Sequence, residues 1–226
     1  MRLRRARLPV LAEISGDHDE RPGVWSLCRA DHASLAAMLP RLERKRAVLV
    51  TGDGDVAPLV AVAVASAAAS AGRRTALVEC DVVRPRLAAA LGLRAEPGLH
   101  EYLRWEAQPE EIVQPVLLAG PAAAGVGEPL ACVCAGRPAA NPETLLGLGS
   151  FLHAVAKLRS AYELVVLAGP PVAEDPGPAL AVARQADAVV AGLPAPQASG
   201  REGRPLRRAI RGLPAPALGT VAVALL

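Results

Sequence analysis

Short runs of apolar, mostly β-branched residues alternate along the chain with Ala-, Leu- and Arg-rich segments of helical length. The runs lack a polar/apolar alternation, which is typical of parallel strands covered on both faces. Strands are predicted at residues 47–51, 75–80, 130–135, 163–168, 187–193 and 219–225. Helices are predicted at residues 25–41, 57–71, 84–91, 142–160, 177–186 and 199–212. The pattern indicates an α/β fold, with a mostly parallel sheet of about seven strands and helices on both faces.

Two stretches interrupt this alternation. Residues 97–111, PGLHEYLRWEAQPEE, are predicted to form an excursion on the surface, and residues 117–130, LLAGPAAAGVGEPL, a mobile loop. The pair Asn141-Pro142 supplies a helix N-cap followed by proline at the first helical position, so we expect the fourth helix to begin there.

The composition indicates a single domain with an apolar core. The chain has 226 residues, of which 52% are hydrophobic, enough to bury a core without metals or disulfides. Residues 1–22 are interpreted as a basic N-terminal tail or linker, and residues 23–226 as the domain. No run is predicted to be a signal peptide or a transmembrane helix. The net charge of +3 is too small to indicate a nucleic-acid partner.

The cysteines do not have the spacing of a zinc site or of a secretory disulfide framework. We predict that they are buried thiols in a reducing cytoplasm. They are Cys28, Cys80, Cys132 and Cys134.

The segment LVTGDGDVAPLVAVAVA, residues 49–65, has the outline of a phosphate-binding loop. An apolar strand is followed by Gly52 and Gly54 and then by a helix, and glycines before a helix N-terminus let backbone N–H groups approach a phosphate. However, no lysine, serine or threonine stands where the loop enters the helix. No lysine occurs at all between Lys45 and Lys157.

The chain resembles the cytoplasmic domain of the bacterial tyrosine kinases that control capsular and exopolysaccharide export. The resemblance covers nearly the whole chain and rests on LPVLAEI, VLVTGDGD…ASAGRRTALVECDVVRPRLAAALGL, PGLHEYL, AGRPAANPETLL and YELVVLAGPPV…D. These kinases belong to the P-loop ATPases with deviant Walker motifs, which include chromosome-partitioning and division-site proteins. The resemblance implies a Rossmann-like P-loop NTPase fold, with ATP and Mg²⁺ as the family's cofactors.

The first motif of this family departs from its pattern here. The loop is about two residues shorter than in the family when it is aligned backwards from the strand at residue 75. Gly54 and Asp55 match the family's Gly-Glu pair, but Val56 replaces the next glycine. Ala57 stands in place of the lysine, and Pro58 in place of the Mg²⁺-binding serine. We interpret these positions, with Gly52, as a vestigial phosphate loop.

The two acidic motifs of the family also depart from their pattern. The family's D-x-D-x-R reads ECDVV here, so Glu79 and Asp81 are surviving acids and Val83 replaces the arginine. The strand that should end in Asp-Thr-Pro-Pro ends with Ala168 and Gly169 before two prolines. No catalytic residue, cofactor or metal is therefore expected, and Asp81 is the metal ligand if there is one. Arg84 and Arg86 follow a strand end and are candidates for an anion contact, with surface ion pairs as the alternative.

The loss of these groups has a large expected cost. A hydrogen bond to a charged group contributes roughly 1.5–3 kcal/mol, so losing the lysine, the metal hydroxyl and the carboxylate removes about 4–8 kcal/mol of nucleotide binding. At about 1.4 kcal/mol per decade, Mg-nucleotide binding weakens by roughly three to five orders of magnitude. The leading hypothesis is a pseudokinase or pseudo-ATPase that acts as a binding or regulatory subunit in capsular or exopolysaccharide biosynthesis and export.

Two rival functions remain open. The chain could be an active ATP-dependent tyrosine kinase or ATPase with atypical residues, in which Glu79 and Asp81 would act. It could instead be a partitioning-like DNA-associated protein that uses a basic late helix, although a solvated face is the simpler interpretation of that helix. Its arginines are Arg201, Arg204, Arg207, Arg208 and Arg211.

The resemblance also suggests partners and a location. The partners would be a membrane polysaccharide chain-length regulator, an active tyrosine kinase paralogue or both, and self-association stays open. The expected location is cytoplasmic, with the basic N-terminus either a flexible start or a contact with anionic lipid at the inner face of the cell membrane. The family's C-terminal tyrosine cluster has no counterpart, because the tyrosines are Tyr102 and Tyr162, both interpreted as packing residues.

Overall fold

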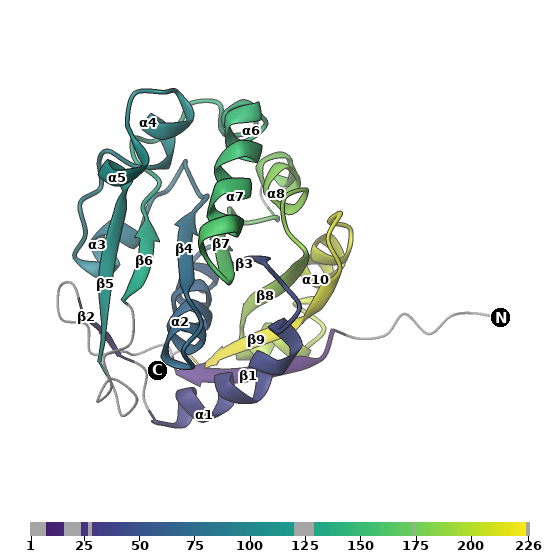
Figure 1. Cartoon of the computed structure of the whole chain (residues 1–226). Coiled ribbons are helices and arrows are strands. Elements are labelled where there is room, and N and C mark those ends of the chain that lie inside the picture. The colour runs from purple at the N-terminus through teal and green to yellow at the C-terminus, as the bar shows by residue number, and fades with distance from the viewer. Residues whose placement is uncertain (1–7, 16–23, 27–28, 120–128, 174, 225–226) are drawn as a thin grey trace.

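One twisted sheet organises the chain (Figure 1). The structure, a computed structural model, describes residues 8–15, 24–26, 29–119, 129–173 and 175–224. Within these residues the sheet has nine strands in the order β1-β9-β8-β3-β7-β4-β6-β5-β2. All neighbouring strands are parallel except the antiparallel pair β5 and β6. The strands are β1 (Val10–Ser15), β2 (Val24–Ser26), β3 (Ala47–Gly52), β4 (Thr75–Glu79), β5 (Val113–Ala119), β6 (Leu130–Val133), β7 (Leu164–Ala168), β8 (Ala188–Pro194) and β9 (Ala217–Ala224).

Helices cover both faces of this sheet and enclose two apolar cores. Residues that alternate along β3 divide between them, since Leu49 faces one core and Val50 the other. One face is covered by α1 (Arg29–Met38), η1 (Leu39–Leu42), α2 (Ala57–Ser70) and α3 (Leu87–Leu91). The other is covered by α4 (Leu99–Leu103), α5 (Pro109–Ile112), α6 (Pro142–Leu146), α7 (Gly149–Ala161), α8 (Pro176–Ala183), α9 (Ala195–Ser199) and α10 (Arg204–Arg211).

Helix α2 is apolar around almost its whole circumference, and it is buried accordingly. It packs on β3, β4, β7 and β8. Its first residue, Ala57, lies so close to β8 that a Cβ on Gly192 would come within 2.9 Å of the Ala57 Cα atom. The start of α2 is thereby held at the carboxyl end of β3, where ligands bind in parallel sheets.

The predicted α/β architecture is confirmed, and all the predicted strands are present as β3, β4, β6, β7, β8 and β9. Sequence analysis missed β1, β2 and β5. Each lies at or next to an end of the sheet, where a strand has fewer neighbours and its pattern is less uniformly apolar. The prediction of about seven strands is therefore too low.

Several helix predictions need correction. Residues 142–160 form two helices, because Leu148 adopts an extended backbone between α6 and α7. Residues 199–212 contain only the end of α9 together with α10. Residues 25 and 26, at the start of the helix predicted at 25–41, belong to strand β2.

The stretch at residues 97–111 is not a surface excursion. Leu99 and Leu103 of α4 are each only 1% exposed, and Tyr102 is buried beside them in the core. Tyr162 packs against the same core, which confirms its predicted role. The predicted mobile loop at 117–130 mostly falls outside the described residues, and its first residues belong to β5.

The domain division at residue 22 stays a prediction, but part of the segment before it is strand β1. This strand pairs with β9, so residues 10–15 are an edge of the sheet rather than a tail. Cys80, Cys132 and Cys134 are buried, as predicted, and Cys28 lies outside the described residues. Among the described helices, none combines the length and the apolar character that crossing a bilayer requires.

Candidate functional site

The glycine loop between β3 and α2 begins with a tight contact between two backbones. Thr51 is buried, and its hydroxyl donates a hydrogen bond to the Pro170 carbonyl oxygen at 2.6 Å. Gly52 has φ of 151°, and a Cβ atom there would collide with the backbone carbonyl of Gly192. Only glycine fits this position, for reasons that concern packing against β8.

The backbone N–H groups of the loop donate to protein oxygens. The N–H of Asp53 donates to the Gly192 carbonyl at 3.0 Å, and that of Asp55 to the Asp53 side chain at 3.1 Å. The N–H groups of Val56 and Ala57 both donate to the Asp53 carbonyl, at 3.3 and 2.8 Å. A phosphate loop needs these donors directed at the ligand. Here the turn closes on itself and uses them internally.

The first residues of α2 offer no charged or hydroxyl group to a ligand. Val56 and Ala57 are buried, so small apolar groups occupy the start of the helix. Pro58 follows and has no backbone N–H to donate. An anion at the start of α2 would therefore interact favourably only with the positive end of the helix dipole.

Two arginines flank the loop. Arg86 forms an ion pair with Asp55 at 2.7 Å. The side chains of Arg84 and Pro171 both lie beside Gly54. The Asp55 side chain is 81% exposed, so the ion pair is screened by water and contributes little stability. Both arginines that were singled out from the sequence therefore lie beside the loop in the structure. Their role as anion contacts stays a prediction.

Glu79 is the last residue of β4, and its buried carboxylate connects β4 to the start of α3 and to the segment after β6. Its Oε1 atom accepts hydrogen bonds from the N–H groups of Arg86 at 2.5 Å and Leu87 at 2.8 Å, where α3 begins. Its Oε2 atom accepts one from Ala135 at 3.0 Å, beyond the end of β6. Burial raises the pKa of Glu79, and these three hydrogen bonds oppose the rise. Both oxygens are thus committed to backbone donors.

Asp81 is also committed to the backbone. Its Oδ1 atom accepts hydrogen bonds from Val83 at 3.3 Å and Arg84 at 3.1 Å, which closes the turn after β4. The side chain is buried. Sequence reasoning identified both acids but not these local roles, which require the positions of the β4–α3 turn and of β6.

The carboxyl end of β7 presents a methyl group next to the loop. Ala168 pairs with Val50 on one side and with Glu79 on the other, and it is 5% exposed. Its carbonyl accepts a hydrogen bond from Cys80 at 2.7 Å. The register therefore puts Ala168 at the centre of the carboxyl edge, where an aspartate would reach toward a metal beside the loop. Within the described residues no group of three or more His, Cys, Asp or Glu side chains could hold a metal ion.

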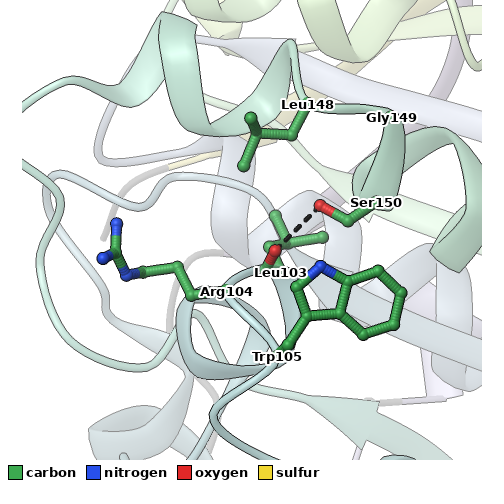
Figure 2. Close-up of a pocket in the computed structure, with 6 residues that line it drawn as sticks. All are labelled: Leu103, Arg104, Trp105, Leu148, Gly149 and Ser150. Carbon is green, nitrogen blue, oxygen red and sulfur yellow. Dashed lines mark hydrogen bonds between the residues drawn. The ribbon is translucent and has the colours of Figure 1, made fainter.

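A second surface feature lies beyond α4, and sequence analysis did not anticipate it. Trp105 is 74% exposed and has φ of 65°, a left-handed conformation that is unusual for an aromatic residue. It borders a hollow of about 420 Å³, with Leu148 across from it (Figure 2). The Ser150 hydroxyl donates to the Leu103 carbonyl at 2.9 Å, which joins α7 to α4 beneath the hollow. The available sequence signal was a tryptophan in a polar stretch of a chain with 2% aromatic residues.

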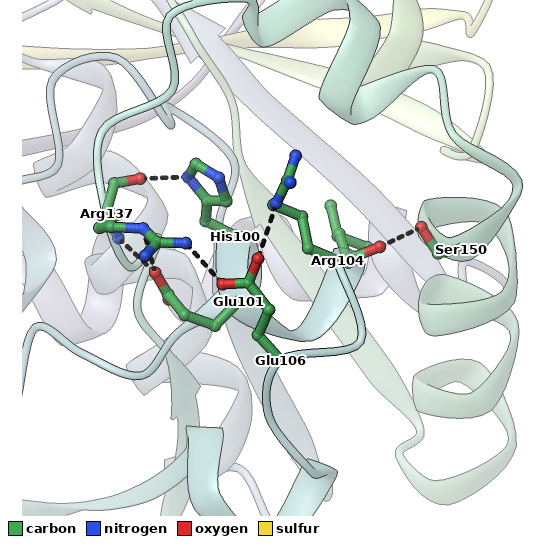
Figure 3. Close-up of polar contacts among 7 residues, drawn as sticks. His100, Glu101, Arg104, Glu106, Arg137 and Ser150 are labelled. Carbon is green, nitrogen blue, oxygen red and sulfur yellow. Dashed lines mark hydrogen bonds and ion pairs between the residues drawn. The ribbon is translucent and has the colours of Figure 1, made fainter.

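A network of charges supports this surface (Figure 3). The buried Glu101 accepts hydrogen bonds from the N–H groups of Gly98 at 2.7 Å and Arg137 at 3.1 Å. The Arg137 side chain reaches Glu106 at 2.5 Å, and Glu106 also binds Arg104 at 2.8 Å. The hydrogen bonds from Arg104 and Arg137 lower the pKa of Glu106. The turn that carries Trp105 is thereby tied to the segment after β6.

Solved structures of similar fold include kinase domains. The kinase domain of Escherichia coli tyrosine kinase ETK has 15% identity and a TM-score of 0.78, over 96% of this chain and 91% of that one. The chimerical protein CapA2B2 has 20% identity and a TM-score of 0.77, over 96% of this chain and 94% of that one.

The fold also extends to nucleotide-binding proteins of another kind. The septum site-determining protein MinD from Pyrococcus horikoshii, complexed with Mg-ADP, has 16% identity and a TM-score of 0.54, over 78% of this chain and 68% of that one. No protein-family model matches the sequence, and no curated protein matches it. At these identities the likeness establishes the P-loop NTPase fold.

Proposed function

We propose that this chain is a catalytically inactive relative of the polysaccharide-export tyrosine kinases, a pseudokinase that serves as a binding or regulatory subunit. The observation that carries the proposal is the closed loop, whose N–H groups at Asp53, Asp55, Val56 and Ala57 donate within the protein. The departures at positions 57, 58 and 168 point the same way, since they concern the cation, the metal hydroxyl and the metal-supporting acid.

We expect titration calorimetry with Mg-ATP to show no binding in the micromolar range. The lost contacts weaken binding by roughly three to five orders of magnitude, and opening the loop to free its donors adds to that cost. Micromolar binding would contradict the proposal. A domain that retains the family's lysine, serine and aspartate is the positive control for the titration.

The rival function is an ATPase or kinase with atypical residues. What favours it is the position of Arg84 and Arg86, which lie beside the loop and could replace a missing cation. It predicts phosphate release that Asp81→Ala abolishes, whereas the inactive protein has no release to lose. Because Asp81 holds the turn after β4, the melting temperature of the variant must be compared with that of the wild type.

The surface around Trp105 supports a role in protein binding. Trp105 and the exposed Leu148 border the same hollow and form an apolar patch, and tryptophan is among the residues that contribute most to protein interfaces. We propose that this patch contacts an active tyrosine kinase paralogue, and that the complex lies at the inner face of the membrane with a chain-length regulator.

Trp105→Ala is expected to weaken binding to the cytoplasmic domain of such a kinase by about 30-fold, since a buried tryptophan anchor contributes about 2 kcal/mol or more. Leu117→Ala is a control, because Leu117 is also exposed but lies on β5. Titration of the purified kinase domain against each variant measures the effect. Equal affinities for Trp105→Ala and the wild type would remove the patch from the interface.

A further inference from the structure

The outer face of α10 carries arginines that pair with no carboxylate among the described residues. Arg204, Arg208 and Arg211 recur at helical spacing, so they share one face of the helix, and Arg201 lies in the preceding turn. All four are exposed. In the part of the chain that the structure describes, none of their guanidinium groups makes an ion pair or a hydrogen bond. Residues 201–211 contain five arginines and a single acid, Glu202, which gives this segment a net charge of +4.

This arrangement differs from that of arginines elsewhere in the protein. Arg86, Arg104, Arg137 and Arg159 each pair with a carboxylate. Like charges spaced four residues apart destabilise a helix, so α10 carries a repulsion that an external anion would relieve. Binding of a negatively charged partner to this face would therefore reduce the repulsion between the arginines.

Arg207 does not belong to this face. Its side chain donates to the backbone carbonyls of Gln197 and Gly200, the latter at 2.7 Å, and so holds α9 against α10. Ile210 is buried in the core and Leu206 packs against it, which anchors the inner side of the helix. Arg207 thus lies on the predicted basic helix, but its side chain binds backbone carbonyls and does not share the exposed face of the other arginines.

The exposed side of α10 is an open surface with little polar content besides the arginines. Arg204 and Arg208 border a hollow of about 590 Å³ together with Pro205 and Ala209. Contacts with DNA usually draw on Ser, Thr, Asn and Gln side chains as well as on cations, and α10 has none of these. Arginine side chains whose stems lie along small apolar residues suit the headgroup layer of a membrane.

We propose that the arginine face of α10, with Arg201 in the turn before it, binds the surface of a bilayer that contains anionic phospholipids. A cluster of four to eight basic residues on one helix or beside a membrane is the usual size of such a binding surface. The binding requires neither nucleotide nor a protein partner, so it stands independently of whether the loop after β3 is inactive.

The test is sedimentation of the full chain with vesicles of phosphatidylcholine alone and of phosphatidylcholine mixed with an equal part of phosphatidylglycerol. Binding is expected only to the anionic vesicles, and it should weaken as salt is raised. The double variant Arg204→Gln/Arg208→Gln should reduce the partition coefficient by about 30-fold, since each arginine near an anionic surface contributes about fivefold. Both side chains are exposed, so the variant should melt like the wild type.

The matched control is Arg41→Gln/Arg44→Gln, which removes the same charge from exposed positions in and after η1, on the opposite face of the sheet. It should retain most of the binding. An equal loss in both double variants would overturn the proposal, because it would indicate a response to net charge alone. Failure to bind anionic vesicles would also overturn it, as would stronger binding to an arbitrary DNA duplex at the same ionic strength.

Discussion

Replacing Gly52 with alanine is expected to lower the free energy of unfolding by about 3–5 kcal/mol. The φ of 151° is unfavourable for any residue with a Cβ atom, at a cost of about 1–3 kcal/mol. The new methyl group would also collide with the Gly192 carbonyl, which is backbone and cannot rotate away. Overpacking of this kind costs about 1–3 kcal/mol more. For a chain of this length each kcal/mol lowers the melting temperature by about 2–4 °C, which thermal unfolding followed by circular dichroism would measure.

Gly149→Ala is the control for this change. A Cβ atom at Gly149 meets no other atom within 4 Å, and the residue begins α7. Alanine there is expected to be neutral or stabilising by about 1 kcal/mol, because it favours the helix. Similar melting temperatures for the two variants would show that Gly52 is not held against β8. The result matters for function, because it separates a glycine required by packing from one required by a phosphate.

Replacing Glu79 with alanine should destabilise the protein by about 3–5 kcal/mol. The change leaves the N–H groups of Leu87 and Ala135 buried without an acceptor, and each such group costs about 1–3 kcal/mol. The part-buried N–H group of Arg86 also loses its acceptor, and this adds to the cost. Glu79→Gln keeps one oxygen for two of these donors, so its loss should be smaller, about 1–2 kcal/mol. Urea unfolding gives both values, and Glu43→Ala, at an exposed position, should stay within about 0.5 kcal/mol of the wild type.

The pH dependence of Glu79 provides a second readout with a definite sign. Burial raises its pKa in the folded protein, although its backbone hydrogen bonds limit the rise. Between the unfolded and folded pKa values the folded state binds more protons, so the stability of the wild type falls as pH rises through that window. Glu79→Gln lacks this titration, and its stability curve should be flatter there. If Glu79→Ala loses no more stability than Glu43→Ala, the hydrogen bonds of Glu79 do not stabilise the fold. A catalytic role for Glu79 would then have to be considered again.

The two variants together test whether the glycine of the loop and the acid at the end of β4 are required for the packing of the protein. In the structure Gly52 serves the contact with β8, and Glu79 and Asp81 hold the chain between β4 and α3. Residues that the family pattern places near the phosphates can thus be retained for packing.

The central part of the fold was readable from the sequence. Strands β3, β4, β7 and β8 are continuous apolar runs because both their faces are buried, and that burial leaves a direct mark on composition. The edge strand β1 has exposed and buried residues in turn, and β5 contains Pro115 and Gln114, so neither gave a clear signal. Helix α4 was missed as a core element because it is only five residues long and includes His100 and Glu101.

The candidate site divides in a similar way. The sequence alone indicated where the chain departs from the family's pattern, since identity at positions 57, 58 and 168 does not depend on the fold. It also placed Arg84 and Arg86 at the edge of the sheet where the loop lies. It could not show that the N–H group of Asp53 donates to the Gly192 carbonyl, because β8 is distant from the loop in the chain. The N–H groups of Asp55, Val56 and Ala57 donate to Asp53 within the loop itself, and this depends on the turn that the loop adopts.

The sequence by itself determined the class of the fold, the six strands β3, β4, β6, β7, β8 and β9, and the absence of a lysine at the loop, because each follows from local pattern or residue identity. Only the tertiary structure decided which polar groups meet. It turned Glu79 toward three backbone donors, left Trp105 exposed beside Leu148, and separated Arg207 from the arginines of the outer face of α10. These outcomes depend on contacts between segments distant in the chain, which no local pattern records.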